Sequence, residues 1–196
     1  MIIGLCGIQG AGKDTVGDIL VSEYGFIKLT FASTLKDIVS VLFSWPRDLL
    51  EGITEESRIW RETVDDFWTE KTGFENFTPR KALQLIGTDL FRIHFCNDIW
   101  SNIVENKIIT TLKNNPKTNI VVSDCRFSNE FNLIKQFPDS YIIKVVRTPD
   151  ISLNDSSHSS ETEWLNYNFD EILQNDNSIC ELQIKLKSLL DNKSEK

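Results

Sequence analysis

The sequence predicts an α/β fold with a parallel central sheet, and two observations carry this prediction. First, a glycine-rich loop at residues 7–15 separates an apolar run at 1–6 from a run with apolar residues at helical spacing at 16–24. Second, short apolar runs typical of buried strands alternate with longer amphipathic runs along the rest of the chain. Strands that alternate with helices form parallel sheets, whose ligands bind at the carboxyl ends of the strands.

The individual elements follow from periodicity and from end signals. Strands are expected at 1–6, 26–31, 119–124 and 141–146, and helices at 16–24, 32–43, 78–86, 98–112, 131–137 and 181–190. Gly25 ends the first helix, whereas Thr78 and Pro79 supply the N-cap and first residue of a later one. The segment 44–77, rich in Trp, Glu and Arg, predicts an inserted helical segment that covers a substrate. The polar stretch 148–163 predicts a lid-like loop, and 192–196 a frayed tail.

Composition limits the possible functions. A length of 196 residues favours one domain with a substantial core, and a net charge of −8 argues against long contacts with a nucleic-acid backbone. No apolar run approaches the ~20 residues of a membrane span, and the N-terminus has the pattern of a core strand. The four cysteines lack metal-ligand spacing, which favours free thiols in a reducing compartment and hence a cytoplasmic protein.

The loop at 7–15 has the sequence GIQGAGKDT, which predicts a phosphate-binding loop. Its glycines, with Ala11 between Gly10 and Gly12, let backbone N–H groups converge on phosphate oxygens at a helix N-terminus. Lys13 would reach the β- and γ-phosphates of a nucleotide. A glycine turn that only joins strand to helix is the alternative.

The residue after the lysine departs from the usual pattern, in which Ser or Thr holds Mg²⁺. Asp14 stands there and Thr15 follows, which favours small-molecule kinases over GTPases and large ATPases. Thr15 is the candidate metal ligand. Asp14 would either contact the metal through water or cap the helix, and the sequence leaves both open.

A second group of candidates follows the strand at 119–124. Asp124 closes this strand, where a lone carboxylate is unfavourable unless it meets water, a metal or a cation. We expect it to organise Mg²⁺ together with Thr15, although an N-cap role is the alternative. Arg126 lies two residues on, and its planar fork suits phosphate oxygens. Arg147 stands at the edge of the expected lid.

Further candidates for acceptor binding lie in the first half of the chain. Arg80 and Gln84 are one helical turn apart, so the arginine could clamp a monophosphate while the glutamine reads a base edge. Such pairs are also common on solvated helix faces, and Arg92 is a similar case. Phe31 could flank a base and Lys36 could approach the acceptor phosphate, although core and surface roles are the alternatives.

Taken together, these motifs resemble the deoxynucleoside monophosphate kinases of large DNA bacteriophages and related viruses, within the adenylate-kinase-like group of P-loop kinases. The matching segments span most of the chain in order: 10–15, 31–36, 78–88, 98–100, 123–130, 158–161 and 169–175. The resemblance implies a three-layer P-loop NTPase sandwich.

The resemblance also implies roles for individual residues. Gly10, Gly12, Lys13 and Thr15 would hold ATP. The acceptor nucleotide would be held by Lys36, Arg80, Gln84 and Arg126. Lids of this group usually carry arginines, and 148–163 has none, so the charge would come from Arg147 with Arg126, or from Arg58 or Arg61.

The expected function is therefore the Mg²⁺- and ATP-dependent phosphorylation of deoxynucleoside 5′-monophosphates. The expected partners are small nucleotides, with no nucleic-acid polymer and no membrane, in the host cytoplasm if the protein is viral. Whether it forms a homodimer stays open. The alternatives are another small-molecule kinase, such as a phosphomevalonate or dephospho-coenzyme A kinase, and a nucleotide-dependent switch without transferase activity.

Overall fold

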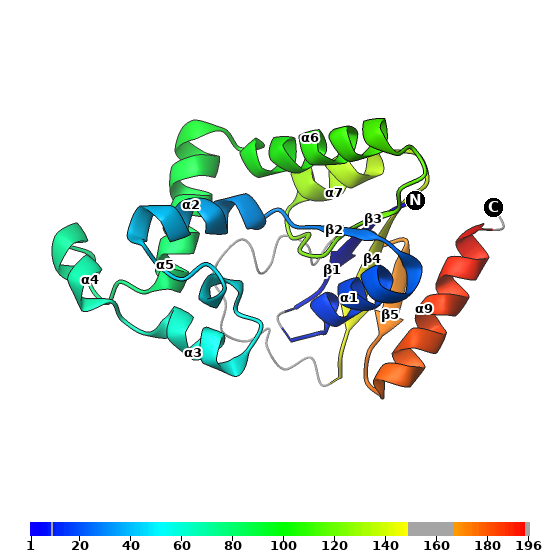
Figure 1. Ribbon diagram of the computed structural model, residues 1–196, viewed down its shortest axis with the longest axis horizontal. Coiled ribbons are helices and arrows are strands. Elements are labelled where there is room, and N and C mark those ends of the chain that lie inside the picture. The colour runs from blue at the N-terminus through cyan, green and yellow to red at the C-terminus, as the bar shows by residue number, and fades with distance from the viewer. Residues whose placement is uncertain (9, 149–166, 195–196) are drawn as a thin grey trace. The chain divides into compact units, whose positions relative to one another are not determined.

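The structure is a computed structural model that describes residues 1–8, 10–148 and 167–194 (Figure 1). All but the first residue of the expected lid at 148–163 lies outside these described residues. The chain folds into two compact units. Unit 1 combines Met1–Thr30 with Val104–Lys196, and unit 2 is Phe31–Ile103.

Unit 1 is built on a parallel five-stranded sheet with the order β2-β3-β1-β4-β5. The strands are β1 (Ile2–Cys6), β2 (Ile27–Leu29), β3 (Ile120–Val122), β4 (Ser140–Val146) and β5 (Glu171–Gln174). All four predicted strands are present and the parallel α/β class is confirmed. β5, at the edge of the sheet, was not predicted. Only Leu173 of its four residues is buried, so it lacks the apolar run of the central strands.

Helices cover both faces of this sheet. On one face, α1 (Lys13–Tyr24) and α9 (Ile179–Ser194) pack on a core that includes Leu5 and Val145. On the other face lies α7 (Ser128–Lys135). A Cβ on Gly4 would come within 2.8 Å of Ile142 Cδ1 and 3.5 Å of Ile134 Cγ1, so α7 approaches β1 closely where glycine stands. The three-layer arrangement is visible in Figure 1.

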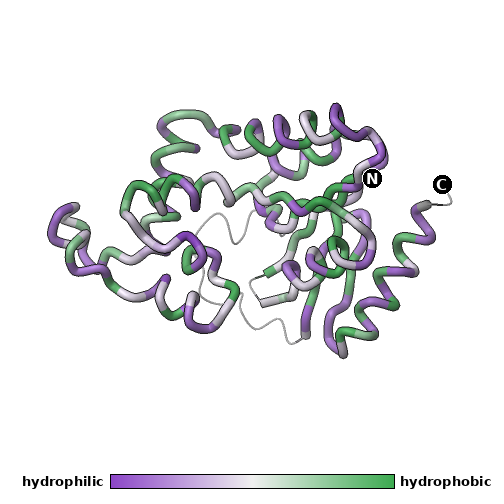
Figure 2. Tube along the Cα trace, viewed as in Figure 1, coloured by the Kyte–Doolittle hydropathy of each residue, from purple (hydrophilic) through white to green (hydrophobic). Residues whose placement is uncertain are grey.

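The last helix, α9, is longer than the pattern predicts. Hydrophobic and hydrophilic residues alternate along it (Figure 2), and its leucines at 182, 186 and 190 are buried. It continues through Ser194, so the expected frayed tail does not start at residue 192, and residues 195–196 of that expectation lie outside the described residues. Lys193 explains the extension, because its Nζ lies 2.9 Å from Glu171 Oε1 and 4.6 Å from the centre of the Tyr141 ring.

Unit 2 is helical. Its elements are α2 (Ser33–Phe43), η1 (Leu49–Glu51), α3 (Glu55–Glu62), α4 (Asp66–Thr72), α5 (Pro79–Gln84), η2 (Leu85–Phe95) and the start of α6 (Ile99–Asn114). The segment 44–77 thus forms short helices joined by loops. Aromatic rings fill its interior: Phe43 stacks on Trp45 with centroids 4.4 Å apart, and Phe77 lies 5.5 Å from Phe43.

The predicted start of α5 is confirmed, but its continuation differs. Thr78 Oγ1 accepts a hydrogen bond from Lys81 N at 3.1 Å, and Pro79 is the first helical residue. Beyond Gln84, the chain does not stop near 86 but runs on as a π-helix, η2. Here Trp100 Nε1 donates to the Gly87 carbonyl at 2.8 Å, which draws that carbonyl into a contact outside the helix. Among the residues that the structure describes, no helix has both the length and the apolar character needed to cross a membrane.

Candidate functional site

The glycine-rich loop connects β1 to α1, as the sequence predicts. Gly7, Gly10 and Gly12 have φ angles of +145°, +86° and +94°, in the region that disfavours residues with a Cβ. A Cβ on Gly7 would also come within 2.3 Å of the Val145 carbonyl oxygen, so the loop leaves β1 tightly against the end of β4. Since α1 begins at Lys13, its N-terminal N–H groups lie at the end of this loop.

Lys13 is held over the loop itself. Its Nζ donates to the carbonyls of Gly7 and Ile8, each at 2.8 Å, and the residue is only 8% exposed. A buried ammonium needs such partners. The lysine charge is therefore fixed beside the backbone groups that form an anion-binding loop.

Asn175, directly after β5, is a contact of this loop that the sequence analysis missed. Its Nδ2 donates to the Ala11 carbonyl at 2.8 Å, and its backbone N donates to the Val146 carbonyl at 2.7 Å. Asn175 and Ala11 are 164 residues apart in the chain. The available signal was weak: residue 175 ends one of the segments that carry the family resemblance.

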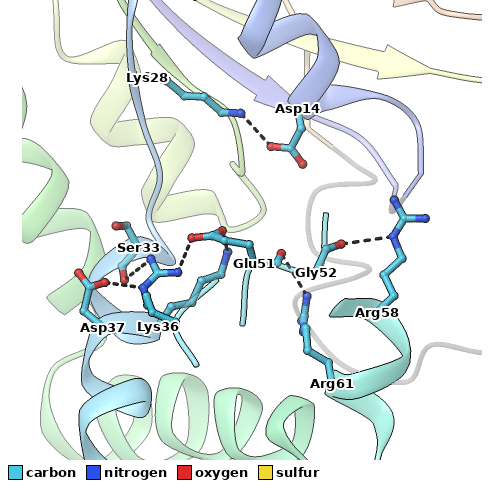
Figure 3. A network of polar contacts seen from close by, with 10 residues as sticks. Asp14, Lys28, Ser33, Lys36, Asp37, Glu51, Gly52, Arg58 and Arg61 are labelled. Atoms are coloured by element: carbon cyan, nitrogen blue, oxygen red, sulfur yellow. Dashed lines mark hydrogen bonds and ion pairs between the residues drawn. The ribbon is translucent and has the colours of Figure 1, made fainter. Parts of the chain in front are cut away.

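Asp14 lies in the first turn of α1 and forms an ion pair with Lys28 on β2 at 3.2 Å (Figure 3). Lys28 also contacts Asp18, at 2.9 Å. Burial alone would lower the pKa of Lys28, but the two carboxylates outweigh it and raise that pKa above its ordinary value. The N-cap position belongs to Gly12, so Asp14 does not cap the helix. Thr15, next to it, is exposed.

Asp124 and Arg126 lie in the turn between β3 and α7. Both are partly buried, and the turn is shaped by Glu130, which is 2% exposed. Glu130 Oε2 accepts hydrogen bonds from the backbone N of Arg126 at 2.7 Å and of Phe127 at 3.1 Å. This carboxylate satisfies two N–H groups at the start of α7 and fixes the backbone that carries Arg126.

The sequence candidates divide between the two units. Unit 1 holds the loop residues 10–15, Asp124, Arg126 and the exposed Arg147, which follow β1, β3 and β4. These three strands are neighbours in a parallel sheet, so their carboxyl ends share one edge. Unit 2 holds Phe31, Lys36, Arg80, Gln84 and Arg92.

Within unit 2, Lys36 belongs to a network of charged groups (Figure 3). Its Nζ lies 2.6 Å from Glu51 Oε2, and Arg47 contacts the other oxygen of the same carboxylate. Arg47 also pairs with Asp37 at 2.6 Å. Burial alone would raise the pKa of Glu51, but Lys36 and Arg47 outweigh it and hold that pKa below its ordinary value. Two cations are thus fixed on one carboxylate.

Arg80 and Gln84 lie one turn apart on α5, as predicted. Arg80 Nη1 lies 3.0 Å from Glu62 Oε1, and Gln84 is partly buried. Phe31 is 4% exposed and Arg92 8% exposed, and Arg92 Nη1 donates to the Asn97 carbonyl at 3.4 Å. Arg80 and Gln84 are therefore more accessible than Phe31 and Arg92.

The two alternative lid arginines contact the end of η1 and the loop that joins it to α3 (Figure 3). Arg58 donates to the carbonyls of Gly52 at 3.3 Å and Ile53 at 2.9 Å, while Arg61 Nη1 donates to that of Glu51 at 3.5 Å. Both side chains stabilise this loop in the structure.

Comparison with known proteins identifies the family. A family model described as deoxynucleotide monophosphate kinase matches residues 50–186. A protein of Acanthamoeba polyphaga mimivirus, provisionally assigned as a deoxynucleotide monophosphate kinase, is 34% identical over 100% of this chain and 98% of its own length. The deoxynucleoside-5′-monophosphate kinase of Escherichia phage T5 is 26% identical over 83% of this chain and 84% of its own.

A solved structure supports the fold independently. The TT1252 protein of Thermus thermophilus superposes with a TM-score of 0.52 at 17% identity, covering 98% of this chain and 97% of that one. At this identity the likeness concerns the fold alone. The family model and the mimivirus protein, which matches nearly end to end, establish more: the chain belongs to the deoxynucleotide monophosphate kinase family.

Proposed function

We propose that the protein transfers the γ-phosphoryl group of ATP to a deoxynucleoside 5′-monophosphate, giving ADP and the deoxynucleoside diphosphate. The observation that carries this proposal is the family match over residues 50–186. The phosphate-binding loop at 7–15 lies outside the matched range, so it supports nucleotide binding separately. The viral relatives agree with an enzyme that supplies DNA precursors.

In this proposal the loop of unit 1 binds the ATP phosphates. Residues 10–15 surround the phosphates through backbone N–H groups, and the N-terminus of α1 adds its partial positive charge. Lys13 supplies a full positive charge next to them, from a position that its bonds to Gly7 and Ile8 already define. Arg126 and Arg147, which follow the two strands on either side of β1, are the proposed arginines for the transferring phosphoryl group.

The residues of unit 1 fit a magnesium ion bound mainly through ATP. Mg²⁺ prefers oxygen ligands and usually keeps several waters, so it needs few protein groups. Thr15 and Asp124 are the proposed oxygen donors. The adjacent Ser123 hydroxyl is buried and has no hydrogen-bond partner among the described residues, which suits a polar ligand at the end of β3. Within the part of the chain that the structure describes, no three or more His, Cys, Asp or Glu side chains form a group that could hold a metal ion. A bound Mg²⁺ would neutralise charge on the phosphates.

Unit 2 supplies the proposed acceptor site. Lys36 and Arg80 would bind the monophosphate, and Gln84 would read the base edge. Lys36 and Arg80 each pair with a carboxylate in the structure, Glu51 and Glu62 respectively. A phosphate dianion carries more charge than a carboxylate, so it can replace the two carboxylates as the partner of these cations.

The chemistry requires no general base. The attacking atom is a phosphate oxygen of the acceptor, which is largely ionised near neutral pH because the second pKa of a phosphate monoester is about 6. Catalysis then consists of holding donor and acceptor in line and stabilising the charge that develops on the transferred group. Water must be excluded to prevent ATP hydrolysis, and we assign this role to the segments 44–77 and 148–163.

The direct test is ADP release from Mg·ATP with each of dAMP, dGMP, dCMP and dTMP, their ribose counterparts and a blank without acceptor. We expect strong turnover with deoxynucleotides, little with the blank, and loss of activity when EDTA removes the metal. ATP binding without turnover on any nucleotide would overturn the proposal in favour of a different acceptor or a switch. Turnover that survives complete metal removal would overturn the magnesium assignment alone.

A further inference from the structure

We propose that Asn175 is a positioning residue for the phosphate loop, whose side-chain amide holds the Ala11 carbonyl in the orientation that ATP binding needs. This inference rests on the proposed function, since it concerns the same donor site. It assigns a role to a residue after β5, a strand that the sequence did not reveal.

The contacts of Asn175 join the loop to the end of β4. Its backbone N is bonded to the Val146 carbonyl at 2.7 Å, which fixes the asparagine on the end of β4. From there Nδ2 reaches the Ala11 carbonyl at 2.8 Å. The beginning of the loop packs on the same strand, because Gly7 lies against the Val145 carbonyl. The end of β4 therefore anchors the loop at Gly7 directly and at Ala11 through Asn175.

The orientation of the Ala11 carbonyl decides which side of the Ala11–Gly12 peptide group, the oxygen or the N–H, faces a bound anion. A carbonyl bonded to Asn175 cannot point toward an anion at the same time, and in a planar trans peptide the N–H of Gly12 points to the opposite side. Freed from Asn175, this peptide could rotate and present its oxygen to the phosphates, because Gly12 tolerates the conformations involved. A rotated peptide would repel the ligand that the loop binds.

The close packing of Asn175 against Gly12 supports a specific contact between this asparagine and the loop. A Cβ at this position would lie 2.2 Å from Asn175 Nδ2, so glycine is required both by its φ of +94° and by the asparagine. The neighbouring residues of the same segment are bonded elsewhere. Asp176 accepts from Thr148, and Asn177 Nδ2 donates to Glu181 Oε2 at 2.6 Å. Asn177 thus provides a matched control on the same segment.

The expected kinetic effect is specific. One neutral hydrogen bond contributes about 0.5–1.5 kcal/mol, so its loss should lower the equilibrium ratio of competent to rotated loop by roughly three- to ten-fold. The competent fraction, and with it the apparent affinity, falls by up to the same factor. For Asn175→Ala we expect the KM for ATP to rise measurably, by up to roughly ten-fold, with kcat at saturating ATP and the KM for the deoxynucleotide within about two-fold of wild type. Asn175→Asp, which keeps the shape but faces the carbonyl with an oxygen, should raise the KM at least as much.

The experiment compares wild type, Asn175→Ala, Asn175→Asp and the control Asn177→Ala. Steady-state kinetics give the KM for each substrate, calorimetric titration with ATP alone gives its affinity, and thermal melting reports stability. Support requires weaker ATP binding in both Asn175 variants, and wild-type values in Asn177→Ala, at a temperature where all four are folded. An unchanged ATP affinity in Asn175→Ala, with or without a lower melting temperature, overturns the inference. So does an equal loss in Asn177→Ala. If the wild type binds ATP but phosphorylates no nucleotide, the proposed function fails, and the titration still decides the role of Asn175.

Discussion

Glu51 offers the sharpest test of the acceptor site. Its carboxylate holds Lys36 at 2.6 Å and also contacts Arg47, and the Lys36 side chain is only 15% exposed. If Lys36 binds the acceptor phosphate, Glu51 competes with that phosphate in every binding event. The substitution Glu51→Gln keeps the size of the side chain and removes its charge, so it removes the competitor.

The magnitude follows from the strength of the ion pair. A partly exposed pair contributes about 0.2–1 kcal/mol, and this is the free energy that the phosphate must replace. We therefore expect Glu51→Gln to lower the KM for the deoxynucleotide by roughly two- to five-fold at saturating ATP. The free energy of unfolding should fall by about 1 kcal/mol, because two pairs are weakened.

Three further variants make the test decisive. Asp37→Asn weakens only Arg47, which Asp37 contacts at 2.6 Å, so it should lower the KM less. Lys36→Met should itself raise the KM, and in its background Glu51→Gln should have much less effect. Steady-state kinetics with one good deoxynucleotide measure these variants, Glu51→Gln and wild type. An unchanged or higher KM in Glu51→Gln, or the same decrease in the presence and absence of Lys36, would refute the reasoning.

The same carboxylate predicts a pH dependence. Because the pKa of Glu51 is lower in the folded than in the unfolded protein, its contribution to stability is present above the ordinary value of 4.5 and is lost as the pH falls through the folded pKa. The stability difference between wild type and Glu51→Gln should therefore be constant near neutrality and shrink in acid. Urea unfolding at several pH values measures it, and a difference that grows in acid would contradict this assignment.

The remaining predictions concern other parts of the chain. Lys13→Ala should leave a folded protein, by circular dichroism, with kcat reduced by about 10²–10³-fold, and near wild-type turnover would remove the loop assignment. Gly7→Ala should destabilise the protein by more than about 1 kcal/mol in urea unfolding, because its Cβ meets the neighbouring strand. Thr78→Ala should cost about 1 kcal/mol in the same assay, and no change would refute the N-cap role. Burial raises the pKa of Cys6 to about 12, so iodoacetamide should modify the exposed Cys180 and spare Cys6 until the protein unfolds, as peptide mass spectrometry can show.

Local signals made much of the fold predictable. The phosphate loop is recognisable because only glycines reach the φ angles it requires, and the cap at Thr78 and the end at Gly25 depend on residues within one turn. The central strands are buried on both faces and so have continuous apolar runs. β5 has a single buried residue at the edge of the sheet, which leaves almost no pattern to detect.

The environment of the candidate site residues was harder to predict, because it depends on partners distant in the chain. The pairing of Lys36 with Glu51 joins residues 15 apart, and that of Arg80 with Glu62 joins residues 18 apart. Neither follows from helical spacing. Asn175 is an extreme case, since its contact with the loop exists only after the last strand has joined the sheet.

The π-helix η2 constrains the length of the chain as well as its conformation. A turn of this type contains about one residue more than an α-helical turn, so the register between α5 and α6 includes that extra residue. If the same residues formed an ordinary α-helix, each would turn the chain by about 100°, which is more than in a π-helix, and the side chains that follow would face another direction relative to α5. Trp100 would then no longer face the Gly87 carbonyl that it contacts now. The wider turns of η2 therefore set the direction in which α6 presents its side chains.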